Sequence, residues 1–553
     1  MHRIRVSIFE ATPAWADPLV LVLLFGFSFF HSLGEAPLLN PDEGRYAEVS
    51  REIIESGDFI TPHLDYVVYL EKPPLCYWLN ALSFMAFGEN EFGARFFSAL
   101  AGLAGILLTW HIGRRVFGRR MGMLSALTLG TSIGYLAQGR LAIIDMLLTF
   151  LLTASIGSFL LATRSDETHK GLYLYSFYIF AALAVLAKGL VGIALPGAII
   201  VLYMALGRRW NLLGKMRITG GITVFLLIAA PWFVAVTLRH PEFPRFFFIH
   251  EHFQRYLTSV HHRYQPFWFF IPVLAGLIFP WSCFAPAAVA GLRGRRACAD
   301  DDAGLFLAIW AALIICFFSC SKSKLVPYIL PALPPTALLI GKTLSALLDG
   351  DFRSLRREAW FLHTALLSGA LGILLYSLLA PKPTIGPLGC AVIAVLLLSE
   401  ALLVGACRRR SSTAGLFLSL FIMTYLQGII GPPFVIAGMQ RKRSCKELAR
   451  LVAKSANAGD TVVCFSSYPQ DIPFYLKRRV ALVGTADDLE FGSTRGDQSS
   501  WFIDYPAFCR RWDSPGRLFV LVDEDDARVF EKAVTTPIKV CGRKESMLVV
   551  TNH

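Results

Sequence analysis

Two acids, an arginine and a tyrosine follow closely on the first apolar stretch of this chain, in the segment Asn40-Pro41-Asp42-Glu43-Gly44-Arg45-Tyr46. A second polar group follows at Glu71-Lys72-Pro73-Pro74. Carboxylates can act as a base or orient a substrate, and a lysine can bind a phosphate as a point charge. A charge at membrane depth costs about 2.5–3.5 kcal/mol, so it usually marks a functional site. These segments therefore predict a catalytic loop at a membrane surface.

The local pattern predicts how the first segment is built. Asn40-Pro41 can start a turn, and Glu43–Ser56 has the periodicity of an amphipathic helix that ends at Gly57. Asp42 is then expected at or near the N-cap, with Arg45 and Tyr46 about one turn along the same side. The alternative is that Asp42 only caps the helix while Glu43 and Arg45 are solvated. The neighbouring apolar stretches favour the site.

Lys72 directly precedes Pro73-Pro74 and the apolar stretch that begins at Leu75. A lysine in this place can anchor the chain at the membrane interface by snorkelling. It can equally bind the phosphate of a lipid-linked substrate. The residues alone leave both interpretations open.

Asp145 lies in an otherwise apolar run, Arg140-Leu-Ala-Ile-Ile-Asp145-Met-Leu-Leu-Thr149. An acid in such a run needs a partner, and Lys72 and Arg140 are the candidates. Lys188, in Ala187-Lys188-Gly189, is a cation in the same situation. Asp145 and Lys188 are both candidates for the site.

Two later segments also carry polar groups. His250-Glu251-His252-Phe253-Gln254-Arg255 favours a phosphate or sugar contact from His250 and Arg255, because two histidines one residue apart diverge on a helix and suit a metal only on a strand. Ser321-Lys322-Ser323-Lys324-Leu325-Val326-Pro327-Tyr328 opens an apolar stretch. Its lysines predict an anion site, with Lys324 and Tyr328 as substrate contacts, and an ordinary surface loop is the alternative.

The composition identifies the chain as a multi-spanning membrane protein. Of its 553 residues 55% are hydrophobic and only 17% are charged. A helical span needs roughly 20 apolar residues. About thirteen such runs, with one further run near 413–431, are found near 18–33, 75–88, 95–112, 122–138, 141–162, 172–188, 190–206, 218–238, 267–290, 303–320, 328–348, 360–380 and 386–406.

Arginine and lysine concentrate in alternate short loops, and this sets the expected orientation. These residues are Arg114, Arg115, Arg119 and Arg120, Arg208, Arg209, Lys215 and Arg217, Arg293, Arg295 and Arg296, Arg353, Arg356 and Arg357, and Arg408 to Arg410. The positive-inside rule places such loops in the cytoplasm, so the polar motifs face outward. The net charge of +13 is therefore a topology signal, and we expect no nucleic-acid partner.

From about residue 440 the composition becomes that of a small soluble domain. We expect a transmembrane domain over residues 1–435 and an outer α/β domain over 440–553, with a helix at Cys445–Ala456, strands at Thr461–Phe465 and Leu518–Val522, and a helix at Asp525–Ala533. One or two disulfides among Cys445, Cys464, Cys509 and Cys541 are compatible with an oxidising compartment, but the spacing does not give the pairing.

Together these motifs resemble the GT-C superfamily of polyprenyl-phosphate-dependent glycosyltransferases. Within it they are similar to the bacterial aminoarabinose transferases that modify lipid A and, more distantly, to protein O-mannosyltransferases. The resemblance covers nearly the whole chain and rests on Asp42–Tyr46, Glu71-Lys72-Pro-Pro, Asp145, Lys188-Gly189, the His-Glu-His-Phe segment, Ser323-Lys324-Leu325 with Tyr328, and Pro473–Leu476 followed by Arg478-Arg479. The family's thirteen spans would place 75–88 in the interface.

The resemblance implies an α-helical polytopic membrane protein with a small C-terminal periplasmic domain, located in the bacterial inner membrane. It implies inverting transfer of 4-amino-4-deoxy-L-arabinose from undecaprenyl phosphate to a lipid A phosphate, and hence resistance to cationic peptides and polymyxin. We expect a monomer among membrane lipids.

The implied chemistry assigns roles to the candidate residues. Lys72, Arg45, Lys188 and Arg255 would neutralise the phosphates, Asp42 would orient the acceptor or the sugar, and Asp145 would hold Lys72. No cofactor is required on this view. A divalent cation bound by Glu71 and the histidine segment stays open.

Two other functions are compatible with parts of the sequence. A related GT-C enzyme would move a hexose or mannose to a hydroxyl of a lipid, glycan or protein, and the residues do not fix the sugar. A transporter would show inverted repeats and charges near span centres. Here the polar clusters lie at the outer ends of the apolar runs, which disfavours transport.

Overall fold

The structure is a computed structural model that describes residues 13–254, 264–293, 301–350 and 352–553. It divides into two compact units, one formed by residues up to 31 and 98–435, the other by residues 32–97 and 436–553. The second of the two segments that form the second unit starts after residue 435, where the sequence predicts a domain boundary. It also takes in the first polar loop, residues 32–97, which the sequence groups with the membrane helices.

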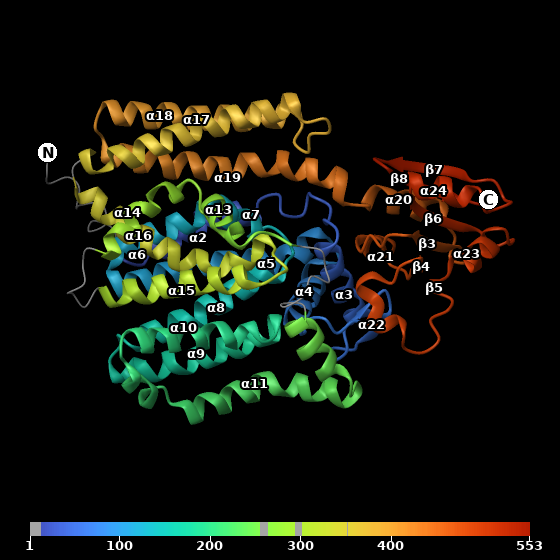
Figure 1. The fold of residues 1–553 in the computed structure, drawn as a ribbon, viewed down its shortest axis with the longest axis horizontal. Helices are drawn as coiled ribbons and strands as arrows, with labels where there is room; N and C mark the ends of the chain where they lie inside the picture. Colours follow the sequence, from blue (N-terminus) through green and yellow to red (C-terminus); the bar gives the residue numbers. More distant parts are fainter. Residues whose placement is uncertain (1–12, 255–263, 294–300, 351) are drawn as a thin grey trace. The chain divides into compact units, whose positions relative to one another are not determined.

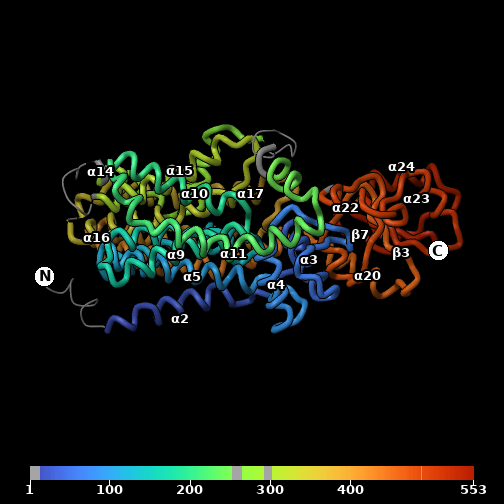
Figure 2. The backbone as a smooth tube through the Cα atoms, turned by 90° about the horizontal axis from the view of Figure 1, so that it is seen from below, coloured from blue at the N-terminus to red at the C-terminus, as the bar shows by residue number. Residues whose placement is uncertain are grey.

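The first unit is helical, and its long helices lie alongside one another in nearly one direction (Figures 1 and 2). Its elements are α2 (Ala16–Phe30), α5 (Glu91–Phe117, from Ser98), α6 (Arg119–Gly130), α7 (Ile133–Gly139), α8 (Ile144–Ala162), α9 (Glu167–Lys188), α10 (Val191–Leu206), η1 (Trp210–Lys215), α11 (Ile218–Arg239), η2 (Arg245–Gln254), η3 (Phe267–Phe269), α13 (Phe270–Leu277), η4 (Trp281–Phe284), α14 (Ala285–Arg293), α15 (Asp301–Cys320), η5 (Val326–Ala332), α16 (Leu333–Asp349), η6 (Phe352–Leu355), α17 (Arg356–Leu379), α18 (Pro387–Arg409) and α19 (Thr413–Arg443).

Within the described residues, nine helices are long and apolar enough to cross a membrane, or ten if one bent pair counts as a span. Three shorter apolar helices accompany them: α2, α4 (Leu75–Phe87) and α10. Each apolar run of the sequence therefore forms helix, although fewer than thirteen of the helices are long enough on their own. α4 is one of the short ones, and its expected place in the interface stays a prediction.

Three apolar runs differ in detail from the expected spans. The run at 267–290 is two helical pieces bent by 108° at a break that contains Pro280, which has no N–H to continue a helix. The run at 122–138 is interrupted after Gly130, where the hydroxyls of Thr131 and Ser132 donate to carbonyls of the preceding turn. α19 does not end at Pro432-Pro433 but continues to Arg443. Proline is tolerated where neighbouring groups satisfy the freed carbonyls.

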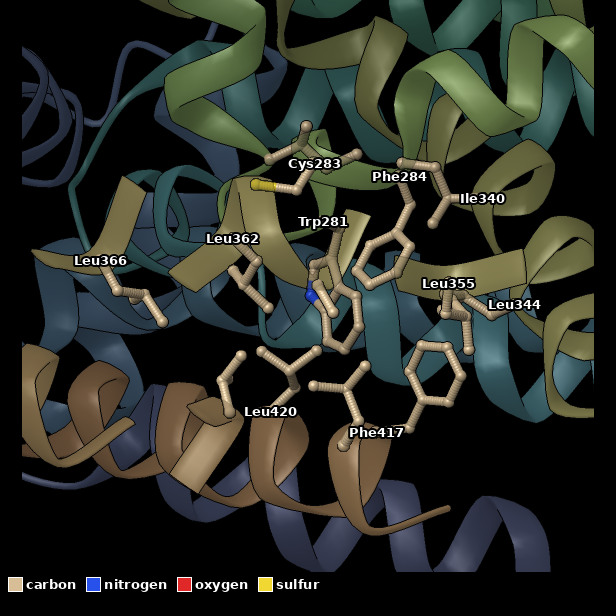
Figure 3. Packing of buried hydrophobic residues seen from close by; sticks show 14 of the residues in the cluster. Trp281, Cys283, Phe284, Ile340, Leu344, Leu355, Leu362, Leu366, Phe417 and Leu420 are labelled. Carbon is tan, nitrogen blue, oxygen red and sulfur yellow. The ribbon is translucent and has the colours of Figure 1, made fainter. Parts of the chain in front are cut away.

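A cluster of buried apolar side chains holds η4, α16, α17, α18 and α19 together (Figure 3). Trp281 lies at its centre and donates its indole N–H to the Thr131 hydroxyl over 2.9 Å. Leu362 of α17 and Leu420 of α19 lie beside this ring, and Leu366 of α17 belongs to the same cluster farther along the helix. The bent segment is therefore fixed by the core of the bundle.

The second unit is built on a six-stranded sheet in the order β5-β4-β3-β6-β8-β7. Strands β3 to β6 pair in parallel, and β7 and β8 are antiparallel. Its elements are α3 (Asp42–Ser56), β1 (His63–Leu64), β2 (Val67–Val68), α4, α20 (Lys446–Ser455), β3 (Thr461–Phe465), α21 (Asp471–Leu476), β4 (Ala481–Val483), η7 (Asp487–Leu489), α22 (Glu490–Ser493), β5 (Phe502–Ile503), α23 (Tyr505–Trp512), β6 (Leu518–Asp523), α24 (Glu524–Glu531), β7 (Lys539–Lys544) and β8 (Met547–Thr551).

The central strands are buried on both faces, which explains their continuous apolar sequence. Phe508 and Trp512 of α23 and Phe530 of α24 form the core on one face of the sheet. The two predicted strands and two predicted helices of the tail are all present, each within two residues of its expected bounds. The four tail cysteines are free thiols, so the tail carries no disulfide among them.

Candidate active site

α3 presents the first polar segment, and it begins one residue earlier than expected. Pro41 is the N-cap, its side chain makes no capping bond, and Asp42 is the first residue of the helix. The helix ends as predicted at Gly57, whose positive φ of 67° suits glycine. Asp42 therefore does not cap α3. Its carboxylate is 50% exposed and lies 3.8 Å from the Arg45 guanidinium.

Glu43 is a structural acid. Its carboxylate accepts two hydrogen bonds of 2.8 Å from the Arg95 guanidinium and one of 2.9 Å from the Leu39 amide. Both charged side chains are buried. This satisfied pair holds the turn before α3 in place and leaves Glu43 unsuited to bind a substrate amine.

Arg45 is buried among acceptors from both parts of the second unit. Its guanidinium donates to the Gln470 side chain over 2.6 Å and lies 2.7 Å from Asp488, and Tyr69 accepts at 3.4 Å. Burial alone would lower the pKa of Arg45, but the oxygens of Tyr69, Asp488 and Glu71 outweigh it and raise the pKa. Arg45 is thus a permanent cation that ties α3 to the tail. The solvated alternative for Glu43 and Arg45 is wrong.

Gly44 allows α3 to approach α21 closely. A Cβ atom at Gly44 would lie 2.5 Å from the Asp471 amide nitrogen, which no side chain tolerates. The Asp471 carboxylate accepts hydrogen bonds from the side-chain amide of Asn40 over 2.5 Å, the hydroxyl of Ser444 over 3.0 Å and the backbone amide of Cys445 over 2.7 Å. One buried carboxylate therefore gathers the start of α3 and the start of α20.

Glu71, Lys72 and Tyr46 lie near this arginine or the helix that carries it. Glu71 accepts from the Tyr69 hydroxyl over 3.1 Å and lies 4.0 Å from Arg45. The Lys72 ammonium donates to the Glu71 carbonyl over 3.0 Å and lies 3.9 Å from its carboxylate. Tyr46 packs against Tyr77 with ring centroids 6.0 Å apart. The structure thus brings all five candidates of the two polar segments into one unit.

Asp145 and Lys188 form an ion pair in the first unit. Asp145 is in the first turn of α8, and Lys188 is the last residue of α9. The Lys188 ammonium also lies 4.8 Å from the centre of the Tyr328 ring. Three separately predicted residues therefore form one cluster, and Lys188 is the partner that Asp145 needs.

Arg140, the other candidate partner in the Asp145 segment, has a structural place instead. It donates to the backbone carbonyls of Ser28 and His31 at the end of α2. Within its own unit Asp145 pairs with Lys188, and the expected role of Asp145 in holding Lys72, a residue of the other unit, stays a prediction. The guanidinium of Arg140 serves the C-terminal carbonyls of a helix, which have no intrahelical donor.

Lys324 and His250 are placed differently from the cluster around Asp145. Lys324 is buried, donates to the carbonyls of Ser321 and Gln265, and lies 6.0 Å from the Tyr264 ring. Burial lowers its pKa. His250 is on the π-helical segment η2, 3.5 Å from Glu251. Arg255 lies outside the described residues.

The residues near Glu71 do not fit a metal ion. Its carboxylate lies next to the cationic side chains of Arg45 and Lys72, which oppose a further cation. In the parts of the chain that the structure describes, no three His, Cys, Asp or Glu side chains come together in a way that could hold a metal.

Gln470, Asp471 and Asp488 belong to the site and were not predicted from the sequence. They lie more than 400 residues after α3. Gln470 and Asp488 contact Arg45 of this helix, and Asp471 exchanges two hydrogen bonds with Asn40 just before it. The one local signal is the stretch Pro469-Gln470-Asp471 ahead of Pro473-Phe-Tyr-Leu, which marks a turn into a short helix. Neither its polarity nor its spacing indicates a partner.

Comparison with known proteins gives two family matches. Residues 71–234 match the dolichyl-phosphate-mannose-protein mannosyltransferase family, and residues 448–552 match the aminoarabinose transferase C-terminal domain. The first match contains Glu71, Lys72, Asp145 and Lys188, and the second contains Gln470, Asp471 and Asp488. The two matches therefore lie on the stretches from which the site is built.

Individual relatives agree. The undecaprenyl phosphate-alpha-4-amino-4-deoxy-L-arabinose arabinosyl transferase of Aeromonas salmonicida (strain A449) is 34% identical over 372 residues, which is 66% of this chain and 65% of that relative. The aligned stretch thus spans just under two thirds of its length. The transferase 1 of the same name from Pseudomonas fluorescens (strain Pf-5) is 33% identical over 70% of both chains.

A solved structure is similar over almost the whole chain. The crystal structure of ArnT from Cupriavidus metallidurans bound to undecaprenyl phosphate aligns with a TM-score of 0.87 and 28% identity, covering 98% of each chain. The helical unit and the sheet unit therefore both have counterparts in one protein. By sequence, family models and fold, the chain belongs to the family of undecaprenyl phosphate-aminoarabinose arabinosyl transferases, membrane glycosyltransferases of the GT-C type.

Proposed function

We propose that this protein transfers 4-amino-4-deoxy-L-arabinose from undecaprenyl phosphate to a phosphate of lipid A. The observation that carries the proposal is the likeness to ArnT over 98% of both chains, since that structure was determined with undecaprenyl phosphate bound. The predicted residues support it, because lysines and acids at the ends of apolar helices suit a reaction between two membrane-anchored phosphates.

The reaction breaks the bond between the sugar C1 and the undecaprenyl phosphate oxygen. An oxygen of the lipid A phosphate forms the new bond to C1 from the opposite face, and undecaprenyl phosphate leaves. The acceptor oxygen is already nucleophilic, so the main barrier is bringing two anions together. Two unit charges 4 Å apart repel by about 4 kcal/mol at an effective dielectric constant near 20. Cations that offset this repulsion should dominate catalysis.

Lys188 and Lys72 are the cations that we assign to this task. Lys188 is oriented by Asp145 and by the Tyr328 ring, so its ammonium is held at the end of α9. Lys72 is held against the Glu71 carbonyl. Arg45 has a different role, because its guanidinium is occupied by Gln470 and Asp488, and it stabilises the loop that presents Asp42.

Asp42 is the exposed acid of its segment. The other acid of α3's first turn, Glu43, is bound by Arg95, and the neighbouring Asp471 of α21 is buried. Asp42 is therefore the acid of this region that can reach a substrate. It would bind the sugar's amine or orient the acceptor phosphate. With a hydroxyl acceptor it would act as the base instead. On this proposal no metal or cofactor takes part.

The proposal places the protein in the bacterial inner membrane as a monomer, with α3 and the sheet unit on the periplasmic side. The support is that basic loops alternate along the chain with the loops that carry the polar motifs. By the positive-inside rule the basic loops, at 114–120, 353–357 and 408–410, lie in the cytoplasm, so the polar motifs lie on the other side. Donor and acceptor lipids would then both reach the site from the outer leaflet.

The test is mass spectrometry of lipid A from a strain that lacks its own transferase and carries this gene. The wild type should add the mass of aminoarabinose, and D42A should not. The control is D525A, because Asp525 is also an exposed acid in a helix's first turn with an arginine at i+3. D525A should modify lipid A like the wild type.

Unmodified lipid A with wild-type protein confirmed in the membrane would contradict the proposal. The alternative is then a GT-C transferase that moves a hexose or mannose to a hydroxyl of another lipid, glycan or protein. Modification by D42A equal to that by D525A would keep the function and remove Asp42 from the site.

A further inference from the structure

A pocket of about 1170 Å³ opens at one end of the α17–α18 helix pair, and none of the residues that we assign to the transfer reaction lines it. α17 and α18 pack along each other (Figure 1). The pocket lies where α17 begins and α18 ends. Five arginines make up its cationic lining, Arg353, Arg356, Arg408, Arg409 and Arg410, and His363 and Ser411 are its other polar residues.

These five arginines have no acidic partner within the described residues. None of them forms an ion pair, and no Asp or Glu is among the described residues that line the pocket. By contrast, Arg120 forms an ion pair with Asp349 over 2.7 Å. Guanidinium groups gathered around one cavity repel each other, so the pocket lowers its electrostatic energy when it takes up an anion.

The pocket continues as an apolar wall toward the middle of both helices. Leu367 of α17 and Leu398 and Leu402 of α18 line it, and Leu402 is 74% exposed. Leu367 and Leu398 are each eleven positions from an arginine of the pocket, Arg356 and Arg409, a rise of roughly 16 Å along a helix. The site therefore has a charged end and an apolar extension of acyl-chain length.

The opposite face of α17 fixes this geometry. Leu362 and Leu366 are buried in the core around Trp281 (Figure 3), so α17 cannot turn its arginines or Leu367 inward. His363 is held as well, because its ring nitrogen lies 2.9 Å from the Ala401 carbonyl of α18. The pocket is thus a fixed feature of the packed helices.

We propose that this pocket is a binding site for an anionic phospholipid. The phosphodiester lies among the arginines, whose planar groups match two phosphate oxygens at once, and an acyl chain lies along the leucine wall. The apolar extension favours a lipid over free phosphate. A basic pocket between helices at the membrane surface is the expected form of such a site. The inference is independent of the proposed transfer.

The experiment is native mass spectrometry of the full-length protein in detergent, titrated with phosphatidylglycerol or with zwitterionic phosphatidylethanolamine. Wild type should bind phosphatidylglycerol at least tenfold more tightly than phosphatidylethanolamine. R356Q/R409Q should lose most of this preference. R115Q/R208Q removes the same charge from exposed arginines that do not line the pocket, and it should bind like the wild type.

Millimolar inorganic phosphate should leave the phosphatidylglycerol adduct in place, and full displacement would mean a site for free phosphate. Equal affinity for the two lipids, or unchanged preference in R356Q/R409Q, would overturn the proposal. If that variant does not purify as a monodisperse protein, R353Q/R410Q makes the same comparison from the other arginines of the pocket.

Discussion

At the scale of single residues, the acids and bases of the polar motifs separate into two groups. Glu43, Arg45 and Arg95 are buried and matched to one another or to the tail. Asp42 is half exposed, and Lys188 is held at the end of a helix. The sequence marks Asp42, Glu43, Arg45 and Lys188 as unusual charges near a membrane, whereas Arg95 was not predicted. Burial separates the residues that build the site from those that can meet a substrate.

The Asp145–Lys188 pair allows a structural role to be separated from a role in transfer. K188M leaves Asp145 without its partner, so it should lower both stability and activity. The loss of a positioned charge typically reduces kcat by about 10²–10³-fold. D145N/K188M removes both charges and should regain most of the stability, since breaking one partner costs about 3–5 kcal/mol and removing both costs much less.

The measurements are lipid A modification and the apparent melting temperature in detergent for K188M, D145N and the double variant. If Lys188 binds the donor phosphate, activity stays lost in D145N/K188M although stability returns. Activity that returns together with stability would make the pair purely structural. K170Q is the control, because Lys170 pairs with the exposed Glu167 on the same helix.

At the scale of elements, α3, α20 and α21 meet around one carboxylate. Asp471 begins α21, contacts the Gly44 position of α3, and accepts from the amide that precedes α20. Burial raises its pKa from 3.8 to about 6, against the hydrogen bonds from Asn40, Cys445 and Ser444 that lower it. The junction that positions the first polar loop therefore contains an acid whose pKa is about 6.

Because the pKa of Asp471 is raised in the folded protein, the sign of the pH dependence of its stability can be stated. The folded protein binds the Asp471 proton more tightly than the unfolded chain, so its contribution to stability is full below pH 3.8 and is lost as pH rises through about 6. The difference corresponds to about 3 kcal/mol at 1.36 kcal/mol per pKa unit. Acidification from pH 7 to pH 5 should therefore stabilise the sheet unit.

The measurement compares the pH dependence of unfolding for the wild type and D471N. The stability advantage of the wild type should grow as pH falls from 7 to 5, because the asparagine amide of the variant does not titrate. Parallel curves for the two proteins would show that Asp471 keeps an ordinary pKa. D497N is a control, since Asp497 is an exposed acid of the same unit whose pKa is lowered by hydrogen bonds from Ser499.

At the scale of the whole molecule, charge patterning predicts which side of the membrane each unit faces. Basic clusters recur in alternate loops between the spans, and the polar motifs and the tail do not lie in these loops. The positive-inside rule places the basic loops in the cytoplasm and the polar motifs and the tail outside it. We expect alkaline phosphatase fused after His553 to be active and green fluorescent protein fused there to be dark, as outside the cytoplasm. Fusions after Arg410, in a basic loop, should give the opposite result. Fluorescence at the C-terminus would reverse the assigned orientation.

The family, the apolar runs and the main tail elements could be predicted because each rests on local pattern. A run of about 20 apolar residues must form helix in a bilayer, since its backbone groups find no water there. The strands at Thr461–Phe465 and Leu518–Asp523 are apolar runs rich in β-branched residues because both of their faces are buried. The break near Pro280 and the continuation past Pro433 depend on neighbouring side chains, so local pattern predicts the wrong ends there.

From the sequence alone we could predict that the chain spans a membrane, which segments are candidates for its chemistry and to which family they belong. Composition, periodicity and short motifs are properties of neighbouring residues along the chain. The folded structure was needed to show that Lys188 is the partner of Asp145, and that Gln470, Asp471 and Asp488 hold the first loop. The two members of each pair are between 43 and more than 400 positions apart in the sequence. Burial selects these partners, because a polar or charged group removed from water needs a hydrogen-bonding or charged partner, and the fold supplies that partner from a distant segment.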